Sequence, residues 1–122
     1  MNANQNPHKT HGDILTEISE GMVRIMKKNY GSGPSQTKTT YGDDLVLVVM
    51  RGEFTKVERT LSEHGQGHMV AQFRHAFQEA MKSDFCSIVE QATGRKVIGF
   101  MSGNQDEPDM LGEIFVLEPA PG

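Results

Sequence analysis

The sequence has few of the cysteines that cross-link small domains and no long apolar run of the kind that crosses a membrane. Of its 122 residues only Cys86 is a cysteine and none is tryptophan, and no apolar run approaches the roughly 18 to 20 residues that cross a bilayer. A lone cysteine excludes an internal disulfide and a CxxC metal site, and it fits a reducing compartment. The first ten residues lack the apolar segment of a signal peptide. We therefore expect a soluble, cytoplasmic protein with one modest core and no direct insertion into a membrane.

Positive charge and catalytic motifs are also scarce. The 12 lysines and arginines are outnumbered by 16 aspartates and glutamates, and the net charge of −4 disfavours nucleic acid as a partner. The chain contains no GxSxG, HExxH or GxGxxG motif. His64 and His68 lack a third metal ligand, and the acidic stretch Asp106–Asp109 does not follow the EF-hand pattern. We predict no catalytic residues, no metal, no cofactor and no enzyme activity.

The clearest strand signal is the apolar run Leu45–Met50, in which three of the six residues are valine. Valine favours strands, and an unbroken apolar run is typical of a strand with both faces covered. The preceding segment 37–41 is rich in β-branched residues, and Gly42-Asp43 predicts a tight reversal between the two. We expect an antiparallel hairpin whose second strand is central and covered on both sides.

A helix is predicted over residues 13–29, with Asp13 as its cap. Apolar residues recur along it at helical spacing, namely Leu15, Ile18, Met22 and Ile25. Gly31 supplies the stop. Gly21 inside this helix costs about 1 kcal/mol relative to alanine, so we expect a close contact that favours glycine there.

The second half predicts helices followed by strands. Thr55 and Glu58 match a capping box, which starts a short helix over 55–64. A single long helix is expected over 67–94, with a core stripe that begins Met69, Phe73, Phe77 and Met81. Strands are expected at 96–101 and 113–118, joined by an acidic, irregular loop over 102–112.

The element order is therefore α-β-β-α-α-β-β, which predicts an α+β fold with a four-stranded, mainly antiparallel sheet of two hairpins packed with helices. A single domain is expected over 13–118, between a disordered tail at 1–12 and a short tail at 119–122. The face of the sheet away from the long helix must be covered by the first helix or by a second subunit. Eight methionines make adaptable contact surfaces, and we expect a homodimer.

One binding site can be placed from the residues alone. Successive glycines can turn backbone N–H groups inward to hold an anion, and nearby cations add charge. The candidate residues are Gly31, Ser32, Gly33, Lys38, Arg51 and Arg74. The alternative is that Gly31–Pro34 is only a helix stop and a connector. Cys86 is expected to pack in the core rather than react.

An ordered set of motifs resembles the MpsC-like family. The set comprises Gly31-x-Gly33-Pro34, Asp43–Gly52, Thr55-x-x-Glu58-x-x-Leu61, Phe77–Met81, Thr93–Val97 and Phe115–Glu118. The resemblance implies a small protein associated with a bacterial Na⁺-translocating, membrane-potential-generating system that is linked to inorganic-carbon uptake. It suggests a non-enzymatic accessory or regulatory protein that docks on a membrane transporter subunit. The alternative is a small-anion or nucleotide sensor that uses the Gly31–Pro34 loop.

Overall fold

Helices and strands follow one another in the predicted order in the computed structural model, which describes residues 9–52 and 55–120. The elements are α1 (His11–Asn29), β1 (Gln36–Gly42), β2 (Leu45–Arg51), α2 (Lys56–Glu63), α3 (Gly67–Ala80), α4 (Lys82–Thr93), β3 (Val97–Asp106) and β4 (Asp109–Leu117). The strands form one antiparallel sheet in the order β1-β2-β4-β3. The predicted α+β fold is confirmed.

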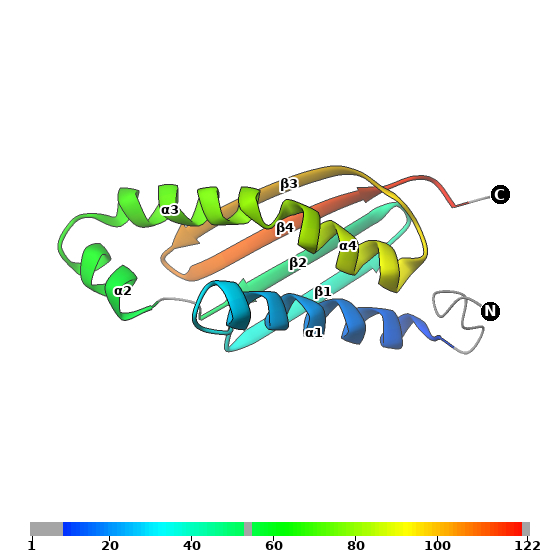
Figure 1. The fold of residues 1–122 in the computed structure, drawn as a ribbon, viewed down its shortest axis with the longest axis horizontal. Helices are drawn as coiled ribbons and strands as arrows, with labels where there is room; N and C mark the ends of the chain where they lie inside the picture. The colour runs from blue at the N-terminus through cyan, green and yellow to red at the C-terminus, as the bar shows by residue number, and fades with distance from the viewer. Residues whose placement is uncertain (1–8, 53–54, 121–122) are drawn as a thin grey trace.

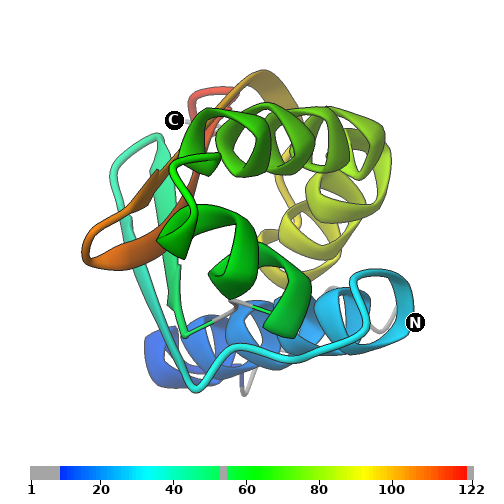
Figure 2. The same cartoon turned by 90° about the vertical axis from the view of Figure 1, so that its left-hand side faces the viewer.

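The helices lie on one face of the sheet. Figure 1 shows α1 running along β1, while α3 and α4 lie over β3 and β4. In the end view of Figure 2 the strands stand on the left and the helices occupy the other side. The core lies between these two layers, and its buried apolar residues are Ile18, Met22, Met26, Val46, Val48, Met50, Phe85, Val89, Ala92, Leu111, Phe115 and Leu117.

Helix α1 starts two residues earlier than predicted. Thr10, not Asp13, is its cap: the Thr10 side chain accepts from the Asp13 N–H, and the Asp13 carboxylate accepts from the Thr10 N–H. Lys9 Nζ donates to the carbonyl of Ala92 at 3.0 Å, so residues 9–12 are tied to the domain. Residues 1–8 of the expected tail lie outside the described residues, as do residues 121–122.

The expected close contact at Gly21 is confirmed. A Cβ at this position would lie 2.7 Å from Cγ2 of Ile88 on α4. Atoms cannot approach so closely, so α1 and α4 pack at a distance that only glycine permits. Gly21 therefore lowers the helix propensity of α1 but allows α1 to pack closely against α4.

Within one chain β2 is covered on one face only, so the expectation that the first helix could cover the other face is wrong. Val46, Val48 and Met50 are fully buried, whereas Leu45 and Leu47 are 49% and 37% exposed. The reason is that all helices lie on one face, so alternate residues of every strand point away from the core. We call this second side the open sheet face. The register gives its members as Gln36, Lys38, Thr40, Gly42, Leu45, Leu47, Val49, Arg51, Gly99, Met101, Gly103, Gln105, Met110, Gly112, Ile114 and Val116.

Two further predictions are wrong. The long helix is broken at Met81, where ψ is near 1°, into α3 and α4. The break lets α3 follow β3 while α4 turns toward α1 (Figure 1). The region 102–112 is also not an irregular loop, because β3 and β4 pair through it as far as Asp106 and Asp109. Its polar residues suggested a loop, but Asn104 faces α3 and donates to the carbonyl of Ala71 at 3.2 Å.

Candidate functional site

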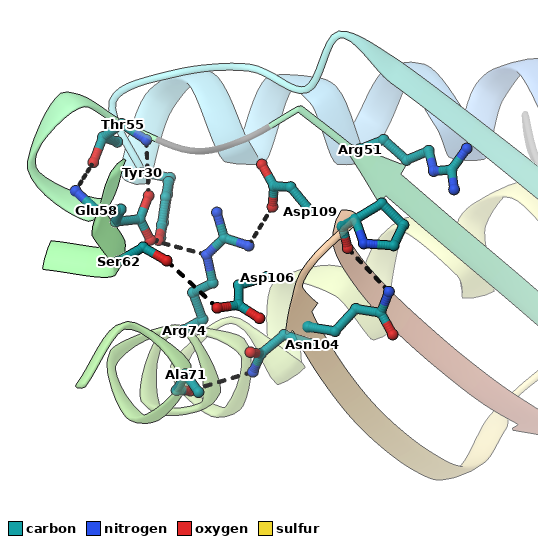
Figure 3. Close-up of polar contacts among 12 residues, drawn as sticks. Tyr30, Arg51, Thr55, Glu58, Ser62, Ala71, Arg74, Asn104, Asp106 and Asp109 are labelled. Carbon is teal, nitrogen blue, oxygen red and sulfur yellow. Dashed lines mark hydrogen bonds and ion pairs between the residues drawn. The ribbon is translucent and has the colours of Figure 1, made fainter. Parts of the chain in front are cut away.

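A buried charge network lies where α2 and α3 meet the end of the sheet (Figure 3). The guanidinium of Arg74 is only 1% exposed and contacts two carboxylates. Its Nε lies 2.9 Å from Oε2 of Glu58, and its Nη1 lies 2.6 Å from Oδ1 of Asp109. The network therefore joins α2, α3 and the first residue of β4.

Glu58 is held in place by the start of its own helix. In the predicted capping box, which is confirmed, the Thr55 N–H donates to Glu58 Oε1 at 2.9 Å and the Glu58 N–H donates to Thr55 Oγ1 at 3.2 Å. The hydroxyl of Tyr30, which caps the end of α1, donates to Oε2 of the same carboxylate. One carboxylate thus connects α1, α2 and α3.

The electrostatics of the network keep Glu58 and Arg74 charged. Burial alone would raise the pKa of Glu58, but hydrogen bonds from Arg74, from the Thr55 N–H and from Tyr30 outweigh it and lower that pKa. Burial opposes the charge of Arg74 too, yet Glu58 and Asp109 raise its pKa. Burial and the bond to Glu58 raise the pKa of Tyr30, which stays a neutral donor. Each charged group of the network therefore has an oppositely charged neighbour inside the protein.

A second polar cluster continues the network along α3. Gln78 and Glu113 are fully buried, and Nε2 of Gln78 donates to Oε2 of Glu113 at 2.7 Å and to the carbonyl of Gly103 at 2.9 Å. Helix α3 is thereby fastened to both β3 and β4 by polar contacts. Such buried polar contacts fix relative positions because any displacement leaves a group unpaired.

Helix α3 consequently has an inverted pattern. Its buried residues are Val70, Arg74 and Gln78, whereas Met69 is 49% and Phe73 is 61% exposed. The prediction that Met69 and Phe73 belong to the core is wrong, because the residues one position further along, Val70 and Arg74, occupy the inner face. We call Met69 and Phe73, which are neighbours on one helical face, the α3 patch.

A small cleft adjoins the network. It measures about 340 Å³ and is lined by Gly67, His68, Arg74 and Asp106, among others. Ser62 on α2 donates to Oδ2 of Asp106 at 3.4 Å (Figure 3). Among the described residues, no group of three or more histidine, cysteine, aspartate or glutamate side chains could hold a metal ion.

A protein-family model matches nearly the whole chain. The model described as Na⁺-translocating membrane potential-generating system (MpsC) matches residues 10–119. The chain belongs to the MpsC family. The resemblance is thereby confirmed, and the family name links the chain to a Na⁺ membrane-potential system. No curated protein and no solved structure matches the chain. Among the helices described, none has the length and apolar character needed to span a membrane.

In this MpsC-family chain the residues proposed for an anion site are spread over both faces of the sheet. Lys38 and Arg51 belong to the open sheet face, and Figure 3 shows Arg51 pointing away from Arg74. Arg74 lies on the helix side, where two carboxylates hold it. The structure does not bring these cations together.

The glycine loop itself has a conformational role. Gly31 has φ of 92°, which ends α1, and a Cβ on Gly33 would lie 2.8 Å from Cγ of Lys27. Ser32, the sixth candidate, lies between them. The loop then leads to Ser35, whose N–H donates to the carbonyl of Arg51 at 2.9 Å. These features are those of a helix stop and a connector.

The network residues were only partly visible in the sequence. The capping box was predicted from its spacing, but Arg74 and Asp109 lie 16 and 51 residues beyond Glu58, and no local rule joins them. The available signal was the recurrence of Val70, Arg74 and Gln78 every four residues. Cys86 is half-buried, and burial, followed by the charge of Glu90, raises its pKa, which favours an unreactive thiol.

Proposed function

We propose that the protein is a non-enzymatic accessory or regulatory component of a bacterial Na⁺-translocating system linked to membrane potential and inorganic-carbon transport. It works in the cytoplasm as a homodimer and reaches the membrane by docking on a transporter subunit. The observation that carries the proposal is the family match over residues 10–119.

The α3 patch supports a docking role, and we propose that the partner binds there. A surface helix normally turns its apolar stripe to the core and its charges to solvent. Helix α3 does the reverse, because Arg74 and Gln78 are inside while Met69 and Phe73 are outside. Aromatic and methionine side chains are enriched in the cores of protein–protein interfaces. A protein partner that covers these two side chains accounts for the inversion.

The buried network supports a role without catalysis. Glu58, Arg74 and Asp109 bind one another at short distances and fix three helices against the sheet. Catalytic acids and bases usually have pKa values moved toward neutrality, whereas the pKa of Glu58 is lowered and that of Arg74 is raised. The network positions α3 against α2 and β4, and Glu58 and Arg74 keep their charges at neutral pH.

Cross-linking in native membranes tests this proposal. A tagged wild-type chain, cross-linked in the cells that encode it, should recover integral membrane subunits of the Na⁺ system. Phe73→Glu should lose them, because it places a charge in the contact. Gln72→Glu adds the same charge beside the α3 patch and serves as the matched control, which should retain them. Recovery of no integral membrane protein by the wild-type chain would refute the docking role.

A further inference from the structure

The open sheet face is apolar over part of its area. Besides Leu45 and Leu47, it exposes Met101, which is 55% accessible. Four strands about 4.8 Å apart, with seven paired residues at about 3.3 Å each, span roughly 400 Å² in projection. Its apolar residues occupy part of that area, and exposed apolar patches of a few hundred Å² are often functional.

Two adjacent rows cross this face, one raised and one hollow. The register aligns Leu47 with Ile114 and Ile114 with Met101, and these three side chains form a ridge. The next row aligns Val49 with Gly112 and Gly112 with Gly103. There the missing side chains leave a hollow of about 210 Å³.

Within the described residues, nothing requires glycine in the hollow. Neither Gly103 nor Gly112 has a positive φ, and a Cβ at either position would meet nothing within 4 Å. Glycine weakens a strand, and it often marks a place where another group approaches closely. The space therefore suits a side chain that comes from outside the chain.

We propose that the open sheet face is the homodimer interface, in which the ridge of each copy fills the hollow of the other. A two-fold axis that crosses the strands between the two rows exchanges ridge and hollow, so the same contact forms twice. Facing sheets pack about 10 Å apart with their inner side chains interdigitated. This inference rests on the homodimer of the proposed function and adds where the second copy lies.

Charge agrees with the same arrangement. The strand positions of the open sheet face carry two cations, Lys38 and Arg51, near one end and no carboxylate. The opposite end of the β1–β2 hairpin is the turn that contains Asp43 and Asp44, of which Asp44 forms an ion pair with Arg95 at 2.5 Å. The proposed rotation brings the basic end of each copy over the acidic turn of the other. A second copy thus fits the shape of the face, and its Asp43 carboxylate lies near these cations.

The mass of the protein in solution tests the interface. By light scattering, the wild-type chain should have twice its 13.5 kDa mass. Gly103→Val fills the hollow, and Leu47→Lys charges the ridge. Each should halve the mass and leave the circular dichroism spectrum unchanged, because neither residue touches the core. Met69→Lys, an equivalent change on the helix side, should keep the two-chain mass. A wild-type chain with a single-chain mass, or a two-chain mass in both ridge and hollow variants, would overturn the interface.

Methionine oxidation tests the same interface in the unmodified protein. Met101 and Met69 are similarly exposed in one chain, at 55% and 49%, so peroxide should oxidise them at similar rates unless Met101 is covered. We expect Met101 to oxidise several-fold more slowly than Met69 in the wild type and equally fast in Leu47→Lys. Equal rates in the wild type would contradict the inference. Neither measurement involves the membrane partner, so a failure here and a failure of the docking proposal are distinguishable.

Discussion

At the scale of single residues, Arg74 has the most demanding environment in the protein. Its charge is buried between Glu58 and Asp109, and breaking a buried ion pair costs far more than breaking an exposed one. Arg74→Met, which keeps the volume but leaves two carboxylates without this cation, should lower the free energy of unfolding by about 3 to 5 kcal/mol.

Urea denaturation measures this effect. The control is Glu17→Gln, which removes a partly exposed ion pair with Lys9 and should cost no more than about 1 kcal/mol. If Arg74→Met were no more costly than Glu17→Gln, the network would not be what fastens α2 and α3 to the sheet.

The lowered pKa of Glu58 predicts that the stability of the protein depends on pH. Its pKa in the folded protein is lowered from the ordinary value of 4.5. A depressed carboxyl pKa stabilises the folded state above the unfolded pKa, and this stability is lost as the pH falls through the folded pKa. Glu58→Gln should therefore be less stable than wild type at pH 7, and the gap should narrow as the pH falls below about 4.5. Unfolding curves at a series of pH values check this, and a constant gap would count against it.

The candidate site shows what sequence can predict at this scale. Thr55 and Glu58 were predictable because a capping box is a local pattern of four residues. The partners of Glu58 were not, because Tyr30, Arg74 and Asp109 come from other elements. Pairing among them depends on how the helices pack, which the spacing along one element does not contain.

At the scale of elements, the contact between α1 and α4 depends on the lack of a side chain at Gly21. Gly21→Ala should gain up to about 1 kcal/mol of helix propensity but lose about 1 to 3 kcal/mol through overlap with Ile88, for a net loss of stability. In an Ile88→Ala background the overlap disappears, so the same change should become neutral or stabilising. Thermal unfolding of the four proteins measures this coupling, and additive effects would contradict it.

The elements themselves were largely predictable. The first helix, the first hairpin and the capping box follow local patterns of apolar spacing and turn residues, and the structure has all three. The inner face of α3 was not predictable, because its apolar stripe of Met69 and Phe73 is stronger than its polar stripe of Arg74 and Gln78. Hydrogen bonds from Arg74 and Gln78 to other elements determine which face of α3 points inward. The pairing of β3 and β4 over 102–112 was not predicted for a related reason. Polar residues such as Asn104 suggested a loop, but Asn104 donates a hydrogen bond to α3.

At the scale of the whole molecule, the half-covered strand β2 is the most informative feature. The run Leu45–Met50 reads as covered on both sides, yet one chain covers only the side that holds Val46, Val48 and Met50. Sequence reports that a residue is apolar, but it does not say whether its neighbours come from the same chain. Together with the hollow at Gly103 and Gly112, the run supports our proposal that a second copy supplies the other layer.

Two copies joined through their sheets would present two α3 patches on the outside. Helix α3 lies on the face of the sheet opposite the proposed interface (Figure 2), so sheet pairing leaves Met69 and Phe73 accessible. We expect a wild-type complex with the membrane subunit to contain an even number of these chains. Native mass spectrometry of the solubilised complex counts them, and a single chain per complex would contradict this arrangement.

The most direct test of the central claim is the Na⁺-dependent membrane potential of cells that encode this chain, followed with a voltage-sensitive dye. Deletion of the gene should reduce that potential. The wild-type chain and Gln72→Glu should restore it, and Phe73→Glu should not, although it folds. An unchanged Na⁺-dependent potential in the deletion strain would contradict the account.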